Sequence, residues 1–95
     1  IKGELISADK NKTFNLIKPL RELTGEPLIA KLSFSPNLKA ISRSAKEAGA
    51  DAVCLINTLP AMAIDKKTRE PVLGNITGGL SGPCLKPIAL RAVYE

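Results

Sequence analysis

The sequence contains no histidine and no tryptophan, and it has only two cysteines, Cys54 and Cys84. Zinc sites are built mainly from cysteine and histidine, and hydrolases with a serine or cysteine nucleophile use a histidine base. The two cysteines also lack the CxxC spacing of redox and zinc motifs. We therefore expect no metal site and no such catalytic pair in this chain. Cys54, inside the apolar stretch AVCLIN, is predicted to be a small core residue.

Aromatic residues are also scarce, with Phe14, Phe34 and Tyr94 as the whole set. Proteins that bind single-stranded nucleic acids stack bases on aromatic side chains, so this composition disfavours them. The net charge of +5 permits a polyanionic partner, but the basic residues are spread along the chain. Their one tight group, KKTRE at 66–70, is typical of an exposed turn. A small basic nucleic-acid-binding module is therefore an alternative, and a solvated basic surface is the preferred interpretation.

Long hydrophobic runs are missing as well. No signal peptide and no apolar stretch of membrane-spanning length is visible, so we expect a cytoplasmic protein without membrane association. With 95 residues, of which 44% are hydrophobic, the chain is predicted to be one small globular domain or part of a larger one.

Hydrophobic periodicity predicts two helices in the first half of the chain. The first is expected to start with Thr13 as its cap and to reach about Leu23, with either a kink or a later start at Pro19, and the second to run from about Lys39 to Ala48. The side chains expected to face the core are Phe14, Ile17, Leu20 and Leu23 in the first helix and Ala40, Ile41, Ala45 and Ala48 in the second.

Strand patterns alternate with these helices. The segments 27–34 (PLIAKLSF) and 52–58 (AVCLINT) are largely apolar on both faces, as in a parallel sheet covered by helices. Between 59 and 83, AMAID and PVLG flank the charged KKTRE and predict a hairpin. A third helix is expected from Pro83 or Pro87 to the end of the chain.

This order is typical of βα units and predicts an α/β fold. Two strands cannot enclose a core. Residues 1–95 are therefore predicted to form a central fragment of a (β/α)8 TIM barrel, with about two βα units, a hairpin inserted in a βα loop and no second domain. We expect the isolated fragment neither to fold stably nor to be active.

Polar residues on the strands are candidates for a site. Lys31 interrupts an apolar strand, and it either extends to solvent from an edge strand or faces an anionic ligand or an electron-rich cofactor. Asn57 and Thr58 end the second strand. They are either plain turn residues or ligands to a molecule with adjacent C=O and N–H groups, because active sites of barrels lie at the carboxyl ends of the strands.

The glycine-rich stretch GNITGGLSGPCLKP (74–87) precedes the third predicted helix. Neither GxxxxGK[ST] nor GxGxxG is present in it, so a nucleotide-phosphate loop is disfavoured. The glycines then indicate a close approach of the backbone to something flat, or a positive φ.

Three segments together resemble the catalytic subunit of class 1, B-type dihydroorotate dehydrogenases. They are AKLSFSPN with Lys31, INTLPAMAID with Asn57 and Thr58, and PVLGNITGGLSGPCLKPIAL with Ser81 and Gly82. The resemblance covers roughly residues 11–95, whereas the start, IKGELISADKNKT, departs from the glycine-rich run expected there. The flavin domain of dihydropyrimidine dehydrogenase shares the KL-x-PN, Asn-Thr and glycine-turn pattern and is the alternative.

The resemblance implies a barrel enzyme that uses FMN to oxidise dihydroorotate to orotate in pyrimidine biosynthesis. It implies FMN contacts for Lys31, Ser81 and Gly82, and substrate contacts for Asn57 and Thr58. It places the catalytic base, a cysteine, upstream of this chain, so no catalytic residue is assigned here. It also implies a partner subunit that carries FAD and an iron–sulfur cluster and passes electrons to NAD⁺, and a homo-oligomer of the full-length protein.

Overall fold

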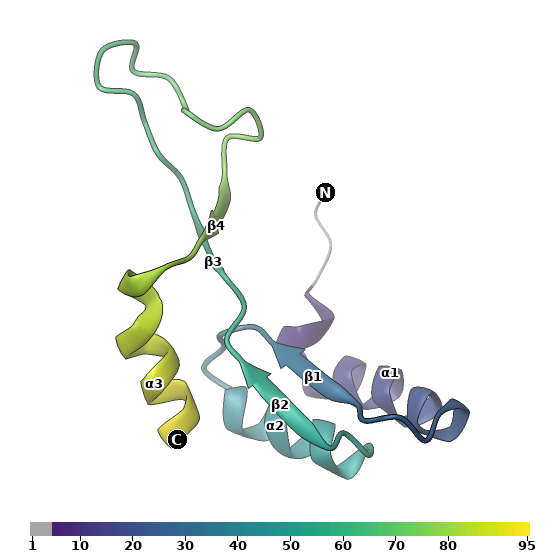
Figure 1. Cartoon of the computed structure of the whole chain (residues 1–95). Coiled ribbons are helices and arrows are strands. Elements are labelled where there is room, and N and C mark those ends of the chain that lie inside the picture. Colours follow the sequence, from purple (N-terminus) through teal and green to yellow (C-terminus); the bar gives the residue numbers. More distant parts are fainter. Residues whose placement is uncertain (1–4) are drawn as a thin grey trace.

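The structure is a computed structural model that describes residues 5–95 (Figure 1). Three α-helices and four short strands follow one another with two 3₁₀ turns, as the alternation in the sequence predicts. In chain order they are η1 (Ile6–Ala8), α1 (Lys10–Leu23), β1 (Ile29–Leu32), α2 (Leu38–Glu47), β2 (Ala52–Leu55), β3 (Leu59–Ala61), β4 (Gly78–Leu80), η2 (Pro83–Leu85) and α3 (Lys86–Tyr94).

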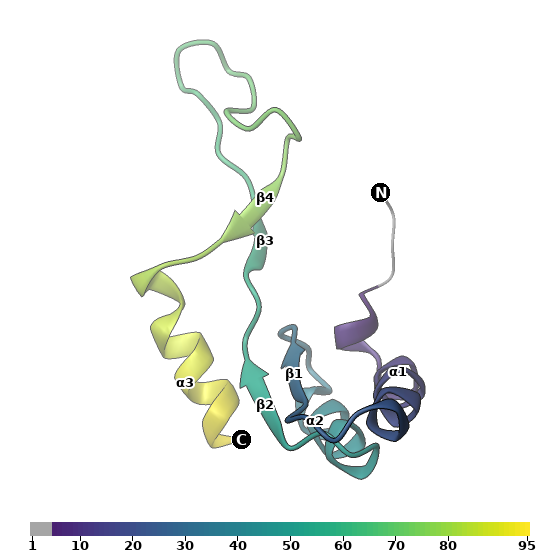
Figure 2. The same cartoon turned by 45° about the vertical axis from the view of Figure 1, so that its right-hand side comes forward.

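β1 and β2 form a parallel pair joined by α2, in register from Ile29 opposite Ala52 to Leu32 opposite Leu55. α1 and α2 cover one face of this pair, and α3 flanks β2 (Figures 1 and 2). Both strands are shorter than predicted, because the ladder ends where the chains diverge after Leu32 and Leu55. The α/β class is confirmed. Two strands do not close a barrel, so residues 5–95 contain at most a βα segment of one.

α1 begins one turn earlier than predicted. The Asp9 side chain accepts a hydrogen bond from the backbone N–H of Lys12 at 2.8 Å and caps the helix. Thr13 is buried instead, and its hydroxyl donates to the carbonyl of Ile6 at 3.0 Å, which ties α1 to η1. The prediction that Thr13 caps the helix was wrong, because an aspartate is available one turn upstream. The helix continues through Pro19.

The core lies between the parallel strands and the helices, in two adjoining clusters. Ile17, Ile41, Ala45 and Ala48 are buried as predicted. Ala40 is exposed and Leu38 takes the inward position, because residues 38, 41, 45 and 48 share one face of the helix and residue 40 lies about 100° away from residue 41. Leu20 and Leu23 are also exposed, with 41% and 82% of their surface accessible. The clusters are Leu32, Leu38, Ile41 and Ala92, and Ile17, Ala45 and Ala48.

The uncovered face of the sheet carries Ile29 and Lys31 on β1 and Ala52 and Cys54 on β2. Alternation along the strands and the parallel register place these four residues on one side. Cys54 is exposed, so the prediction of a core cysteine was wrong. Its stretch is apolar on both faces, but only one face is covered by the described residues.

β3 and β4 form an antiparallel neck in which Leu59 lies opposite Leu80 and Ala61 opposite Gly78. A bridge between Ile64 and Pro71 continues the hairpin toward the charged turn at 65–70, which confirms the predicted hairpin. The glycine-rich stretch supplies β4 and is therefore partly strand rather than loop.

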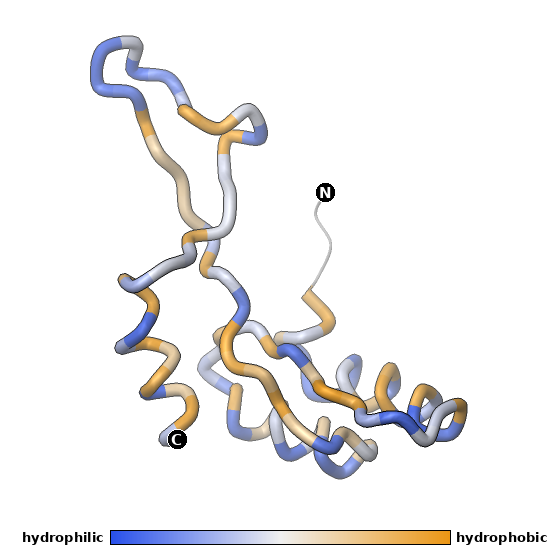
Figure 3. Tube along the Cα trace, viewed as in Figure 1, coloured by the Kyte–Doolittle hydropathy of each residue, from blue (hydrophilic) through white to orange (hydrophobic). Residues whose placement is uncertain are grey.

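The hairpin projects away from the helices, and its tip is hydrophilic (Figures 1 and 3). The radius of gyration is 16.0 Å. A compact domain of this length would have about 12 Å. Leu32 and Ile41 are the largest fully buried side chains, and more large hydrophobic side chains are exposed than buried. Such a small core agrees with a segment that packs against further structure.

Candidate functional site

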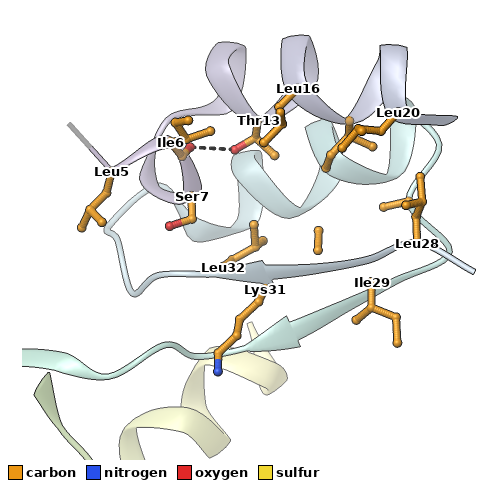
Figure 4. Close-up of a pocket in the computed structure, with 13 residues that line it drawn as sticks. Leu5, Ile6, Ser7, Thr13, Leu16, Leu20, Leu28, Ile29, Lys31 and Leu32 are labelled. Atoms are coloured by element: carbon orange, nitrogen blue, oxygen red, sulfur yellow. Dashed lines mark hydrogen bonds between the residues drawn. The ribbon is translucent and has the colours of Figure 1, made fainter. Parts of the chain in front are cut away.

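Lys31 lies in β1 on the uncovered face of the sheet. Figure 4 shows its side chain and that of Ile29 directed away from α1, whereas Leu16 and Leu20 project from α1 toward the strand. Lys31 is exposed, and its side chain forms no ion pair or hydrogen bond with any residue among 5–95. Its ammonium group is therefore available to an anionic or electron-rich ligand on this face.

Asn57 and Thr58 lie directly beyond the carboxyl end of β2. The backbone N–H of Asn57 donates to the carbonyl of Leu32 at 2.9 Å, which holds this turn against the end of β1. The Asn57 Oδ1 atom accepts from the backbone N–H of Thr58 at 2.9 Å. This bond orients the amide, and within the described chain neither the Asn57 amide nitrogen nor the Thr58 hydroxyl has a hydrogen-bond partner.

The hairpin neck brings Ser81 and Gly82 beside Asn57 and Thr58 at the end of β2. Leu59 is paired with Leu80 at the end of the ladder. Thr58, just before β3, and Ser81, just after β4, therefore lie immediately beyond this last pair. Antiparallel pairing keeps such residues adjacent across the strands. The predicted substrate pair, Asn57 and Thr58, is thus brought together with the predicted cofactor turn, Ser81 and Gly82.

Gly82 has a backbone conformation that favours glycine. Its φ is +96°, and a Cβ built on it would meet no atom within 4 Å. A side chain there would be strained by φ and would project into open space, where it would occupy room that a flat ligand could use. Gly82 accepts a hydrogen bond from the N–H of Leu85 at 3.0 Å and starts the turn into α3.

Chemically, the site offers one ammonium group, one primary amide, two hydroxyls and an exposed backbone at glycine. These groups can bind and orient a planar molecule rich in carbonyl and N–H groups. No cluster of three or more potential metal ligands occurs in residues 5–95. Cys54 lies opposite Lys31 in the sheet register, and Cys84 lies in η2.

The one resolved pKa shift in the described chain belongs to Asp51, at the far end of the strands from the site. The backbone N–H of Leu28, at 2.8 Å, and the Arg21 guanidinium, at 2.9 Å, both donate to Asp51 Oδ2 and lower the pKa of this carboxyl. Arg21 also donates to the carbonyls of Thr24 and Glu26. This network joins the end of α1 to the starts of β1 and β2 and is structural.

A pocket of about 560 Å³ lies between α1 and β1 (Figure 4). Its walls are mainly apolar and include Leu16, Leu20 and Leu28. Of the candidate site residues, Lys31 lines this pocket, whereas Asn57, Thr58, Ser81 and Gly82 do not. Apart from Lys31, the candidate site is therefore a separate group of residues at the strand ends and the hairpin neck.

Gly79, which lies in β4 against the Thr58 side chain, was not predicted from the sequence to be a site residue. The GG pair was visible in the sequence, but the contact depends on strand register.

Among the helices of residues 5–95, none has the length and apolar character needed to cross a membrane.

Comparison with known proteins identifies relatives along nearly the whole chain. The family model described as dihydroorotate dehydrogenase matches residues 2–95. Three similar proteins all bear the name dihydroorotate dehydrogenase B (NAD(+)), catalytic subunit. The protein of Geotalea uraniireducens is 47% identical over 98% of this chain, that of Caldicellulosiruptor saccharolyticus 46% over 98%, and that of Petrotoga mobilis 52% over 85%.

The chain spans 31% of the length of the first two relatives and 27% of the third. The match therefore concerns one segment of a longer type of protein. The family-model match over residues 2–95 contains all five of the residues singled out above for ligand contacts.

Proposed function

The chain belongs to the dihydroorotate dehydrogenase family, and on that premise we propose that the protein containing it oxidises dihydroorotate to orotate with FMN as the hydride acceptor. The observation that carries this proposal is the meeting of Asn57 and Thr58 with Ser81 and Gly82 at the hairpin neck, beside the strand that bears Lys31. We also propose that the chain is part of a (β/α)8 barrel, with α1, α2 and α3 outside and the uncovered face inside.

The residues present fit a flavin. Gly82 leaves open space where any other residue would place a Cβ, and Lys31 has no counter-ion within residues 5–95. Bound FMN would supply the acceptor for the hydride from C6 of the substrate. Lys31 would hold a positive charge near the flavin edge on which negative charge accumulates during reduction. Ser81 and Gly82 would contact the ring through the backbone.

Asn57 and Thr58 would bind and orient the pyrimidine. The Asn57 amide nitrogen can donate to a substrate carbonyl, while its oxygen is held by the Thr58 N–H at 2.9 Å. The Thr58 hydroxyl can donate or accept. Correct orientation of C5 and C6 is the contribution of these two residues, because proton removal from C5 needs a base that we place outside this chain.

The names of the relatives also suggest a partner. They call the relatives a catalytic subunit and include NAD(+), which supports a second subunit that accepts electrons. We propose that this partner carries FAD and an iron–sulfur cluster and that the full-length protein is a homo-oligomer of the cytoplasm, without nucleic-acid or membrane partners.

The test is anaerobic titration of the purified full-length protein. We expect a bound flavin whose visible absorption is bleached by dihydroorotate and is unaffected by uracil with NADPH. Bleaching by uracil with NADPH would favour the dihydropyrimidine dehydrogenase alternative. A protein without flavin that binds nucleic acid with steep salt dependence would overturn both.

A further inference from the structure

Gly79 is in contact with Thr58. A Cβ built on Gly79 would lie 2.8 Å from the Thr58 Cβ and 3.3 Å from its Cγ2, and it would also meet Oγ1. Separations below 3.0 Å are essentially never found for real Cβ atoms. Gly79 is exposed and its φ lies outside the left-handed region, so neither burial nor backbone conformation demands glycine here. Glycine is required because the Thr58 side chain occupies the space that a Cβ would need.

We propose that Gly79 is a positioning residue for the substrate: its missing side chain allows Thr58 to sit against β4 with the hydroxyl directed to the ligand. This inference rests on the proposed function, in which Thr58 binds the pyrimidine. It adds a residue that contacts neither substrate nor cofactor in that proposal.

Thr58 cannot relieve the overlap by rotating its side chain. Rotation about χ1 moves Oγ1 and Cγ2 but leaves Cβ in place, and the distance of 2.8 Å is measured to Cβ. Threonine also has few χ1 conformations available. The backbone of Thr58 or of β4 would therefore have to shift.

A backbone shift at Thr58 would reach Asn57 as well. The Thr58 N–H donates to Asn57 Oδ1 at 2.9 Å, and the Asn57 N–H donates to Leu32 at 2.9 Å. Moving Thr58 pulls on the bond that orients the Asn57 amide. A single methyl group on Gly79 thus disturbs both proposed substrate ligands, although it lies on the other strand of the hairpin.

The experiment compares Gly79→Ala with Gly74→Ala in the full-length flavoprotein. Gly74 lies in the same hairpin, but a Cβ built on it meets nothing within 4 Å and its φ is not left-handed. The readout is the dissociation constant of orotate, taken from the change in the flavin spectrum on titration. We expect Gly79→Ala to weaken orotate binding by about 10- to 100-fold, because the hydrogen bonds from Thr58 and Asn57 to the ligand would be weakened, and Gly74→Ala to leave it unchanged.

A parent protein that binds orotate, together with a Gly79→Ala variant that binds it equally well, overturns this inference and leaves the proposed function intact. A parent protein that neither binds orotate nor is reduced by dihydroorotate overturns the proposed function itself. The two failures are therefore separate.

If Gly79→Ala yields protein without flavin, the Thr58→Gly background decides the question. Thr58→Gly removes the three atoms nearest to the new methyl group, which are Cβ, Oγ1 and Cγ2 of Thr58. Gly79→Ala should then cause no further loss of soluble, flavin-containing protein or of orotate affinity. A loss of equal size in both backgrounds would mean that the two residues are independent, and would overturn the inference.

Discussion

The body of the chain (residues 6–55, from η1 to β2) encloses Leu32 and Ile41 almost completely, whereas none of residues 59–80 in the hairpin is buried. Helix packing on a parallel sheet and the Arg21–Asp51 network hold the body together. The hairpin has a three-residue ladder, one further bridge and a charged turn. Free energy of folding is therefore concentrated in the body.

The candidate site lies where these two regions join, and it depends on both. The body supplies Lys31 and the Leu32 carbonyl that anchors the turn at Asn57, and the hairpin returns the chain so that Ser81 and Gly82 lie beside Thr58. The site geometry thus rests on a weakly packed hairpin whose neck is fixed by register and by small residues.

Ile41→Ala should give the largest loss of stability. Its side chain is 1% exposed, so truncation leaves a cavity and should lower the free energy of unfolding of the full-length protein by about 2–5 kcal/mol. The matched variant Ile64→Ala, in the hairpin and 57% exposed, should change it by less than about 0.5 kcal/mol. Urea unfolding of both variants measures the contrast. Equal losses would mean that the hairpin is as firmly packed as the body.

Lys31→Met should separate function from stability within the body. The side chain is exposed and has no ion pair in the described chain, so the unfolding midpoint should hardly move. If Lys31 stabilises charge on the flavin, reduction by dihydroorotate should slow by about 10²- to 10³-fold in anaerobic stopped-flow measurements. Lys39→Met, on α2, serves as the control with unchanged rate. An unchanged rate for Lys31→Met would remove this lysine from the proposed site.

The two regions also differed in how far their structure followed from the sequence. The hydrophobic periodicity of the helical segments and the apolar runs of the strand segments predicted the helices and strands of the body, because local pattern and burial agree there. Thr13 was misplaced because helix starts depend on caps, and α1 starts a turn earlier than predicted, whereas Ala40 was misplaced because it lies on a different face of α2 from Ile41, Ala45 and Ala48. Cys54 was misplaced because a sequence apolar on both faces does not reveal which face the chain itself covers.

In the hairpin, the charged turn could be predicted from the sequence, but the β3–β4 neck could not. Gly78 and Gly79 have low strand propensity, and their pairing with Ala61 and Pro60 is decided by long-range register. The site residues were identified through resemblance to a family, and their grouping at one end of the sheet is a result of that register. The contact of Gly79 with Thr58 has no local signal beyond the glycine itself.

Gly49→Ala tests the junction between α2 and β2. The φ of Gly49 is +106°, and an added Cβ would lie 2.7 Å from Cγ of Arg21, whose guanidinium is held by Asp51 and two carbonyls. We expect a loss of about 1–3 kcal/mol in the free energy of unfolding. Gly25→Ala, where nothing lies within 4 Å and φ is not left-handed, should be nearly neutral. A neutral Gly49→Ala would mean that Arg21 moves aside without loss.

The smallest expected effect is the pH dependence caused by Asp51. Its pKa in the folded state is lowered from 3.8, first by the Leu28 N–H and also by Arg21. A carboxyl with a lowered folded pKa stabilises the protein above its unfolded pKa, and this contribution disappears as the pH falls through the folded value. Asp51→Asn should therefore be less stable than the parent at neutral pH, and the difference should shrink on acidification below about pH 4. Unfolding curves across this range measure it, and a difference independent of pH would show that the Asp51 charge contributes nothing to the junction of α1 with the strands.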